Sequence, residues 1–63
     1  MNPDEMLEKR IIEMLESDFK ELQEIVSEIV KTGGKIDKKK LGEAYFTVQR
    51  LHMELYKLIS LLS

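Results

Sequence analysis

Few side chains in this 63-residue chain are able to do chemistry. It has one histidine, His52, and no cysteine. His52 and Asp18 each interrupt an otherwise apolar helical row, so they form a candidate polar layer. Buried together, they would fix the register or the oligomeric state of packed helices, and assembly would respond to pH near the intrinsic pKa of histidine, about 6.5. The alternative interpretation is two tolerated, partly exposed polar positions.

The remaining residue patterns argue against catalysis and against a bound cofactor. No nucleophile or second base accompanies His52 and Asp18. No Glu-x-x-His pair is present for a di-metal site, and thiolate ligands are excluded. The Lys31–Lys35 segment lacks the spacing of a phosphate-binding P-loop. We therefore expect a protein that is not an enzyme and that uses no metal or cofactor.

A group of lysines is the second feature with chemical potential, and it forms a candidate anion-binding tip. Its members are Lys31, Lys35, Lys38, Lys39 and Lys40. They could contact the phosphates of nucleic acid or an anionic membrane surface. No arginine or stacking aromatic accompanies them, so the nucleic-acid signal is weak. The alternatives are a solvated loop, or a tip that meets the acidic start of a second copy of the chain.

The elements that carry these residues are predicted from signals at the helix ends. Asn2 is a good N-cap and Pro3 fits the first helical position, so a helix is expected over residues 3–31. Gly33 suits the left-handed conformation that commonly follows a helix end. The chain should therefore leave its first helix at a loop over residues 32–36.

A second helix is predicted over residues 38–62, with Asp37 as its N-cap. Two long helices joined by a short loop form an antiparallel hairpin. The expected fold class is all-α, in a single domain over residues 1–63.

Two apolar stripes predict how the helices meet. Both stripes have the spacing of three and four residues that marks one helix face. The first comprises Ile12, Leu15, Phe19, Leu22, Val26 and Ile29, and the second Leu41, Ala44, Val48, Leu51, Leu55, Leu58 and Leu62. Laid antiparallel about Lys35, they pair without an insertion, and Phe19 lies level with Leu51.

Apolar residues outside the stripes form a candidate surface for a partner or for an oligomer. They are Phe46, Met53, Tyr56, Tyr45, Ile59, Ile11 and Ile25. A helix that is apolar on two faces is normally buried on both. One interpretation is a core or dimer interface. The other is a docking groove for a different protein, because aromatic residues and methionine are common anchors at such surfaces.

Chain length makes self-association the expected source of stability. A core from so short a chain rarely supplies more than about 3–5 kcal/mol, and disulfides are excluded here. The net charge of −2 conceals nine acidic and four basic residues over 1–31, against three acidic and six basic over 32–63. These complementary halves favour antiparallel pairing. The expected assembly is a homodimer that forms a four-helix bundle.

Composition and layout also indicate the compartment and a related family. No secretory signal or membrane-spanning run is recognisable, so a cytoplasmic protein is expected. With two similar helices around Gly33-Gly34, the chain resembles the Rop family of dimerising hairpins that bind paired RNA loops. That family presents a basic face with a phenylalanine from its first helix. Here the first helix is acidic and Phe19 belongs to the apolar stripe, so RNA binding is not carried over.

The sequence thus predicts a small, non-enzymatic interaction protein, a regulator or adaptor that binds another protein and itself. One alternative is a nucleic-acid-binding hairpin that uses the lysine-rich loop. The other is a small helical subunit of a larger complex.

Overall fold

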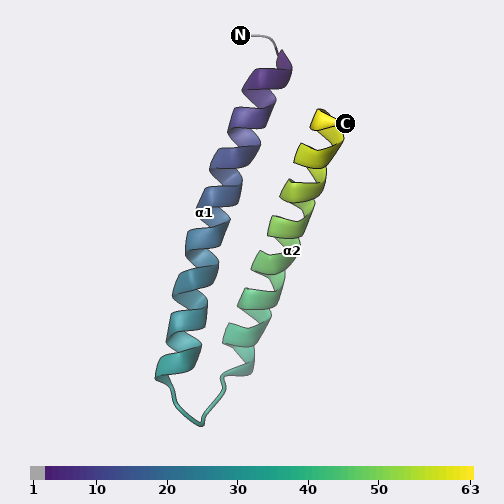
Figure 1. The fold of residues 1–63 in the computed structure, drawn as a ribbon. Coiled ribbons are helices and arrows are strands. Elements are labelled where there is room, and N and C mark those ends of the chain that lie inside the picture. The colour runs from purple at the N-terminus through teal and green to yellow at the C-terminus, as the bar shows by residue number, and fades with distance from the viewer. Residues whose placement is uncertain (1–2) are drawn as a thin grey trace.

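The computed structural model describes residues 3–63 and consists of two helices in an antiparallel hairpin (Figure 1). Helix α1 spans Pro3–Lys31 and helix α2 spans Lys38–Leu62. They run side by side, and their Cα atoms occupy an elongated volume of 49 × 16 × 14 Å. The predicted all-α hairpin is therefore confirmed, with helix ends where local signals put them.

Helix α1 begins and ends on charges that suit its dipole. Asp4 and Glu5 lie in its first turn and Lys31 in its last. The predicted N-cap, Asn2, lies outside the described residues. At the other end the Thr32 hydroxyl donates to the Ile29 carbonyl oxygen at 2.7 Å. This bond satisfies one of the carbonyl groups left free at a helix end.

Helix α2 begins at the cap that the sequence predicts. Asp37 has extended backbone angles, φ −82° and ψ 116°, and its side chain accepts a hydrogen bond from the Lys39 backbone nitrogen. The distance from that nitrogen to Oδ1 of Asp37 is 2.9 Å. This is the geometry of an N-cap residue, which satisfies a free amide in the first turn of the helix.

Gly33, which follows α1, and Gly42, which lies inside α2, should respond in opposite ways to alanine. Gly33 has φ 68°, a left-handed angle that strains any residue with a Cβ, whereas a Cβ on Gly42 would meet open space. We expect Gly33→Ala to lower the unfolding free energy by about 1 kcal/mol, since alanine is strained there. Gly42→Ala should raise it by a similar amount, because α2 gains helix propensity. Thermal unfolding followed by circular dichroism measures both effects, and equal shifts in one direction would contradict the argument.

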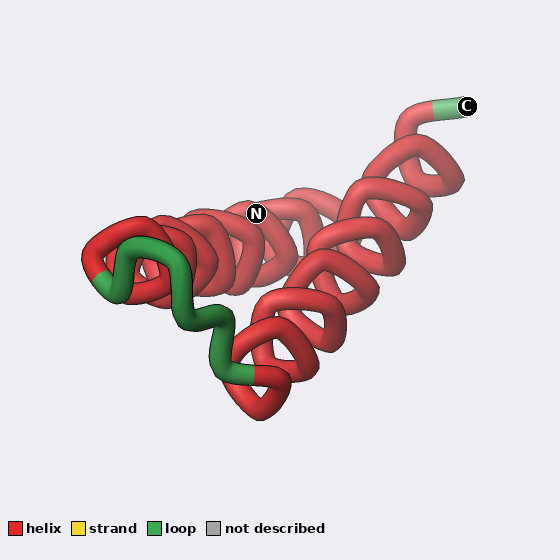
Figure 2. Tube along the Cα trace, turned by 90° about the horizontal axis from the view of Figure 1, so that it is seen from below, coloured by secondary structure: helices red, strands yellow, loops and turns green. Residues whose placement is uncertain are grey.

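The seam between the helices follows a regular alternation of three and four residues. The buried and half-buried residues of α1 are Glu8, Ile11, Leu15, Asp18, Leu22, Ile25 and Ile29. Those of α2 at the same alternation are Lys40, Ala44, Thr47, Leu51, Glu54, Leu58 and Leu61. Figure 2, seen from the loop end, shows the two helices running away from the loop at an inclination to each other. The alternation of three and four residues in the seam is the heptad repeat of coiled-coil packing.

The structure corrects the predicted seam on each helix. Leu15, Leu22 and Ile29 lie in it as expected, but the rows beside them do not. Phe19 is 52% exposed and Leu55 48% exposed, while Ile11 and Ile25 are only 4% and 7% exposed. Each helix is rotated so that the residue preceding an expected core position often enters the seam.

The register between the helices agrees with the expected centre near Lys35. Lys40 Nζ lies 2.7 Å from Glu28 Oε2, and Arg50 Nη2 lies 2.7 Å from Glu21 Oε2. Both pairs join the acidic helix α1 to the more basic helix α2. Exposed ion pairs of this kind contribute about 1 kcal/mol or less each, so they set register more than stability.

No helix within residues 3–63 combines the length and apolarity needed to cross a membrane.

Candidate interaction surfaces and the polar seam

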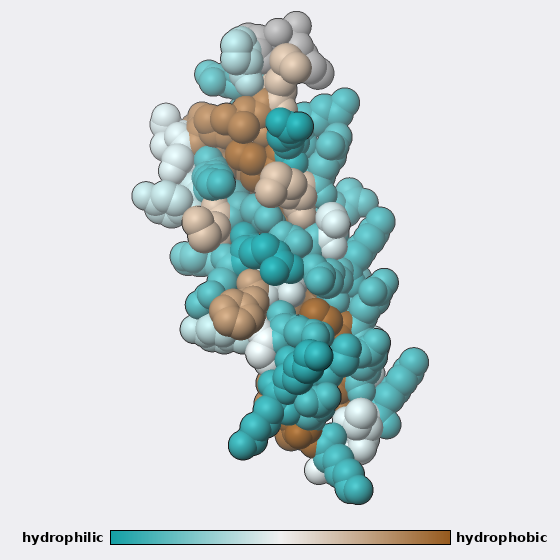
Figure 3. Space-filling view, turned by 180° about the vertical axis from the view of Figure 1, so that it is seen from behind, coloured by the Kyte–Doolittle hydropathy of each residue, from teal (hydrophilic) through white to brown (hydrophobic). Residues whose placement is uncertain are grey.

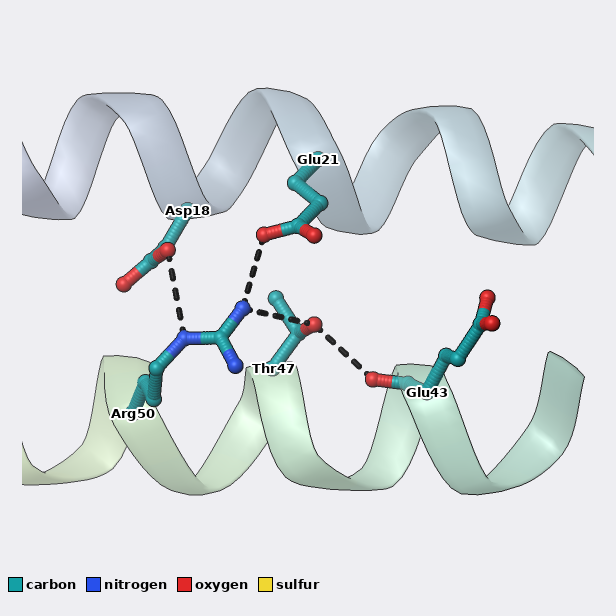
Figure 4. Close-up of polar contacts among 5 residues, drawn as sticks. All are labelled: Asp18, Glu21, Glu43, Thr47 and Arg50. Atoms are coloured by element: carbon teal, nitrogen blue, oxygen red, sulfur yellow. Dashed lines mark hydrogen bonds and ion pairs between the residues drawn. The ribbon is translucent and has the colours of Figure 1, made fainter. Parts of the chain in front are cut away.

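A polar cluster interrupts the middle of the seam (Figure 4). Arg50 of α2 extends between the two carboxylates of α1: its Nε lies 3.4 Å from Asp18 Oδ1 and its Nη2 2.7 Å from Glu21 Oε2. The same Nη2 donates to the Thr47 hydroxyl at 3.2 Å, and that hydroxyl donates to the Glu43 carbonyl oxygen at 2.8 Å. One guanidinium therefore links three side chains across both helices.

Glu54 lies next to this cluster and is the most unusual group in the seam. It is 5% exposed, and its Oε1 has no hydrogen-bond partner among the described residues. Burial and, after it, the hydrogen bond and charge of the neighbouring Asp18 together raise the pKa of Glu54 to about 7, against the opposing charges of Arg50 and Lys57. A buried carboxyl that keeps its proton near neutral pH avoids placing a second negative charge beside Asp18.

The predicted polar layer of Asp18 and His52 is not brought together. Asp18 lies in the seam with its side chain 15% exposed, whereas His52 is exposed on α2. The observed polar layer instead combines Asp18 with Thr47, Arg50 and Glu54. We therefore correct the pairing of Asp18 with His52 and retain only Asp18 as a seam residue.

The two rows displaced from the predicted seam form one exposed surface, which we call the apolar face. Each member directly follows a seam residue along its helix, and in an antiparallel pair of right-handed helices such residues lie on the same side of the seam. The members are Ile12, Phe19 and Val26 of α1, with Leu41, Val48, Leu55 and Leu62 of α2, all exposed. Residues that directly precede seam residues lie on the opposite side, where the middle of the hairpin carries the charged Glu21 and Arg50.

The other residues of the candidate surface are placed in three different environments. Ile11 and Ile25 are buried between α1 and α2, so they are not available to a partner. Tyr45 and Ile59 are exposed, and their helical positions border the apolar face. The remaining three, Phe46, Met53 and Tyr56, are exposed elsewhere on α2, away from that face.

A groove lies at the open end of the hairpin, on the side opposite the apolar face. Its volume is about 450 Å³, and it is lined by Leu7, Arg10, Met14, Tyr56, Lys57 and Leu61, with Ile11 and Ser60 between them. Figure 3 shows one side of the molecule that is largely hydrophilic, with apolar side chains gathered toward the end that carries the termini. We call this hollow the open-end groove.

The lysine tip is partly neutralised. The pKa of Lys40 is raised by its hydrogen bond to Glu28 and, to a smaller extent, by its hydrogen bond to Glu43. The other four tip lysines are exposed, and none forms an ion pair with another described residue. The loop end of the hairpin therefore carries several exposed positive charges. The start of α1, at the opposite end, carries the acidic residues Asp4 and Glu5.

Several residues that matter here were missed by reading the sequence for apolar periodicity. Thr47, Arg50 and Glu54 are polar, so apolar periodicity does not select them. The signal that could have found Thr47 and Glu54 is the strict alternation of seam positions, which passes through both. Among residues 3–63, no three acidic or histidine side chains gather as a metal site would require.

These features define a class: a short antiparallel helical hairpin with a polar seam and an uncovered apolar face. The family described as Sulfolobus spindle-shape virus 1, protein D-63, matches residues 3–60. The chain belongs to this family. No solved structure matches the chain.

Proposed function

We propose that the chain is a non-enzymatic interaction protein that self-associates through the apolar face into a dimeric four-helix bundle. The observation that carries the proposal is the number of exposed apolar side chains that both helices place on that face. Seven large apolar side chains from both helices lie exposed on one side of the hairpin, and the opposite side carries the charged Glu21 and Arg50 at mid-height. Such an uncovered patch marks an interaction surface.

The direction of the stripes supports a second copy as the occupant. Each predicted stripe alternates seam residues, such as Leu15 and Leu22, with apolar-face residues, such as Phe19. Its centre therefore points roughly halfway between the partner helix and the open apolar face. In a four-helix bundle each helix directs its core stripe between two neighbouring helices in this way.

The heights of the rows along the hairpin support a symmetric arrangement. The apolar-face row of α1 is centred on Phe19, and that of α2 lies midway between Val48 and Leu55. Arg50 reaches both Asp18 and Glu21, so the two centres lie at nearly the same height. A twofold axis that passes through the apolar face at this height lets a second copy cover both rows at once. The interface between the two copies is then self-complementary.

Charge favours the same arrangement. This twofold axis puts the loops of the two copies at opposite ends of the bundle. The lysine tip of one copy then lies near Asp4 and Glu5 of the other, whereas loops at the same end would put two lysine tips together. Opposite charges placed in this way select between arrangements that bury similar apolar area.

Mass in solution tests the proposal. We expect sedimentation equilibrium to give a mass approaching twice 7.4 kDa, and a melting temperature that rises with protein concentration over about two orders of magnitude. Both follow because the dimer is stabilised by mass action. A monomer that unfolds cooperatively at a melting temperature independent of concentration would contradict the proposal.

A further inference from the structure

We infer that the open-end groove binds an acidic amphipathic helix of a partner protein. The groove is formed within one hairpin and lies on the side opposite the apolar face. It therefore stays open when that face is covered, and this inference does not depend on self-association.

The shape of the groove fits a helix. On α1 its walls are Leu7, Arg10 and Met14, spaced over two helical turns, or about 10 Å. On α2 they are Tyr56, Lys57 and Leu61. The α1 wall residues are spaced by three and four positions, which suits the apolar row of a docked helix with anchors at the same spacing.

The chemistry of the walls selects an acidic partner. The floor includes Ile11, which is almost fully buried, and the lining is mostly apolar. Two cations, Arg10 and Lys57, border it, no acidic residue lines it, and neither cation forms an ion pair with another described residue. Carboxylates on either side of an apolar row would meet these cations.

The types of side chain present are those that anchor protein interfaces. Tyrosine and arginine are enriched among residues that dominate binding energy, and methionine adapts to irregular partner surfaces. Tyr56, Arg10 and Met14 bring all three types to the groove. This makes Tyr56 part of a partner site rather than of the self-association face.

Two synthetic peptides test the inference. Both carry the same row of leucines at helical spacing, one flanked by glutamates and the other by lysines. Fluorescence anisotropy should give one acidic peptide bound per chain, with an affinity at least about tenfold above that of the basic peptide. The NMR signal of the Met14 methyl group should shift on binding, while those of the Val26 methyl groups should not.

Charge reversal gives the sharper readout. The double variant Arg10→Glu/Lys57→Glu should prefer the basic peptide. The single variant Tyr56→Ser should weaken the binding of both peptides. The matched control, Lys9→Glu/Lys20→Glu, makes the same change in net charge away from the groove and should keep the acidic preference. Circular dichroism verifies that each variant remains helical.

Three results would overturn the inference: equal binding of the two peptides, an acidic preference that survives Arg10→Glu/Lys57→Glu, or a Met14 shift produced by sodium decanoate and by neither peptide. The last would assign the groove to a small amphipathic anion. Peptide binding by a chain that stays monomeric would count against the proposed self-association alone, and a dimer that binds neither peptide would count against the groove alone.

Discussion

Phe19→Glu combined with Leu55→Glu should convert the protein to a monomer. Both side chains lie on the apolar face, are about half exposed in the hairpin, and would be fully covered in the proposed dimer. Fully burying a phenylalanine or leucine contributes about 1.5–3 kcal/mol, and the dimer buries only the exposed half of each of four side chains, or about 3–6 kcal/mol in all. We expect the dissociation constant to rise by at least about a hundredfold, since each 1.4 kcal/mol corresponds to a factor of about ten. Sedimentation equilibrium measures the change.

The matched control is Phe46→Glu combined with Met53→Glu. These side chains are 62% and 58% exposed, so they are at least as accessible as Phe19 and Leu55. They lie away from the apolar face, and the proposed dimer leaves them uncovered. If this control became monomeric while Phe19→Glu/Leu55→Glu stayed dimeric, Phe46 and Met53 would mark the true interface.

The helix ends and the register could be predicted from the sequence because their causes are local. Asp37 caps α2 by accepting a hydrogen bond from the residue two positions later. Gly33 adopts a left-handed φ angle that glycine allows without help from distant residues. The register follows from the position of the loop, which fixes which residues of two antiparallel helices lie level. None of these features depends on knowing what else covers the molecule.

The residues that face the partner helix could not be predicted in the same way. The predicted and observed seams of α1 share Leu15, Leu22 and Ile29, and differ only in the rows beside them. Counting apolar residues favours the row of Phe19, but the structure buries the row of Asp18. In a helix with two faces to cover, periodicity identifies the combined stripe without saying which edge of it meets which neighbour.

Polar residues are tolerated in the seam because each is satisfied or neutralised. The Thr47 hydroxyl donates within its own helix, and Asp18 is joined to Arg50. Glu54 has a third solution, the retention of its proton. A search for apolar spacing finds Asp18 as an interruption of an apolar row but misses Thr47 and Glu54, because it does not register how a polar side chain is satisfied.

Glu54 should make the hairpin less stable as the pH rises from about 4.5 to about 7. Burial and the adjacent Asp18 carboxylate raise its pKa in the folded chain from 4.5 to about 7. Within this window the folded state holds a proton that the unfolded state has released. The stabilising contribution is therefore complete below pH 4.5 and is lost as the pH rises through 7. A shift of this size corresponds to about 3 kcal/mol, and chemical denaturation at a series of pH values measures the loss.

Two variants of Glu54 sharpen this expectation. Glu54→Gln is permanently neutral, so it should flatten the stability profile between pH 5 and 7. Glu54→Leu should be more stable than the parent chain at pH 8, because an apolar side chain replaces a buried carboxylate beside Asp18. Glu16→Gln, which changes an exposed carboxylate, should leave the slope unchanged.

His52 is the one histidine of the chain and provides the remaining control. His52→Gln should retain the full loss of stability between pH 4.5 and 7 if Glu54 is its source. If the dependence of stability on pH persisted in Glu54→Gln and disappeared in His52→Gln, its source would be His52 on the exposed side of α2 and not Glu54 in the seam. Because Glu54 lies inside one hairpin and His52 borders the apolar face, the same pair of variants also separates a response of the fold from a response of self-association.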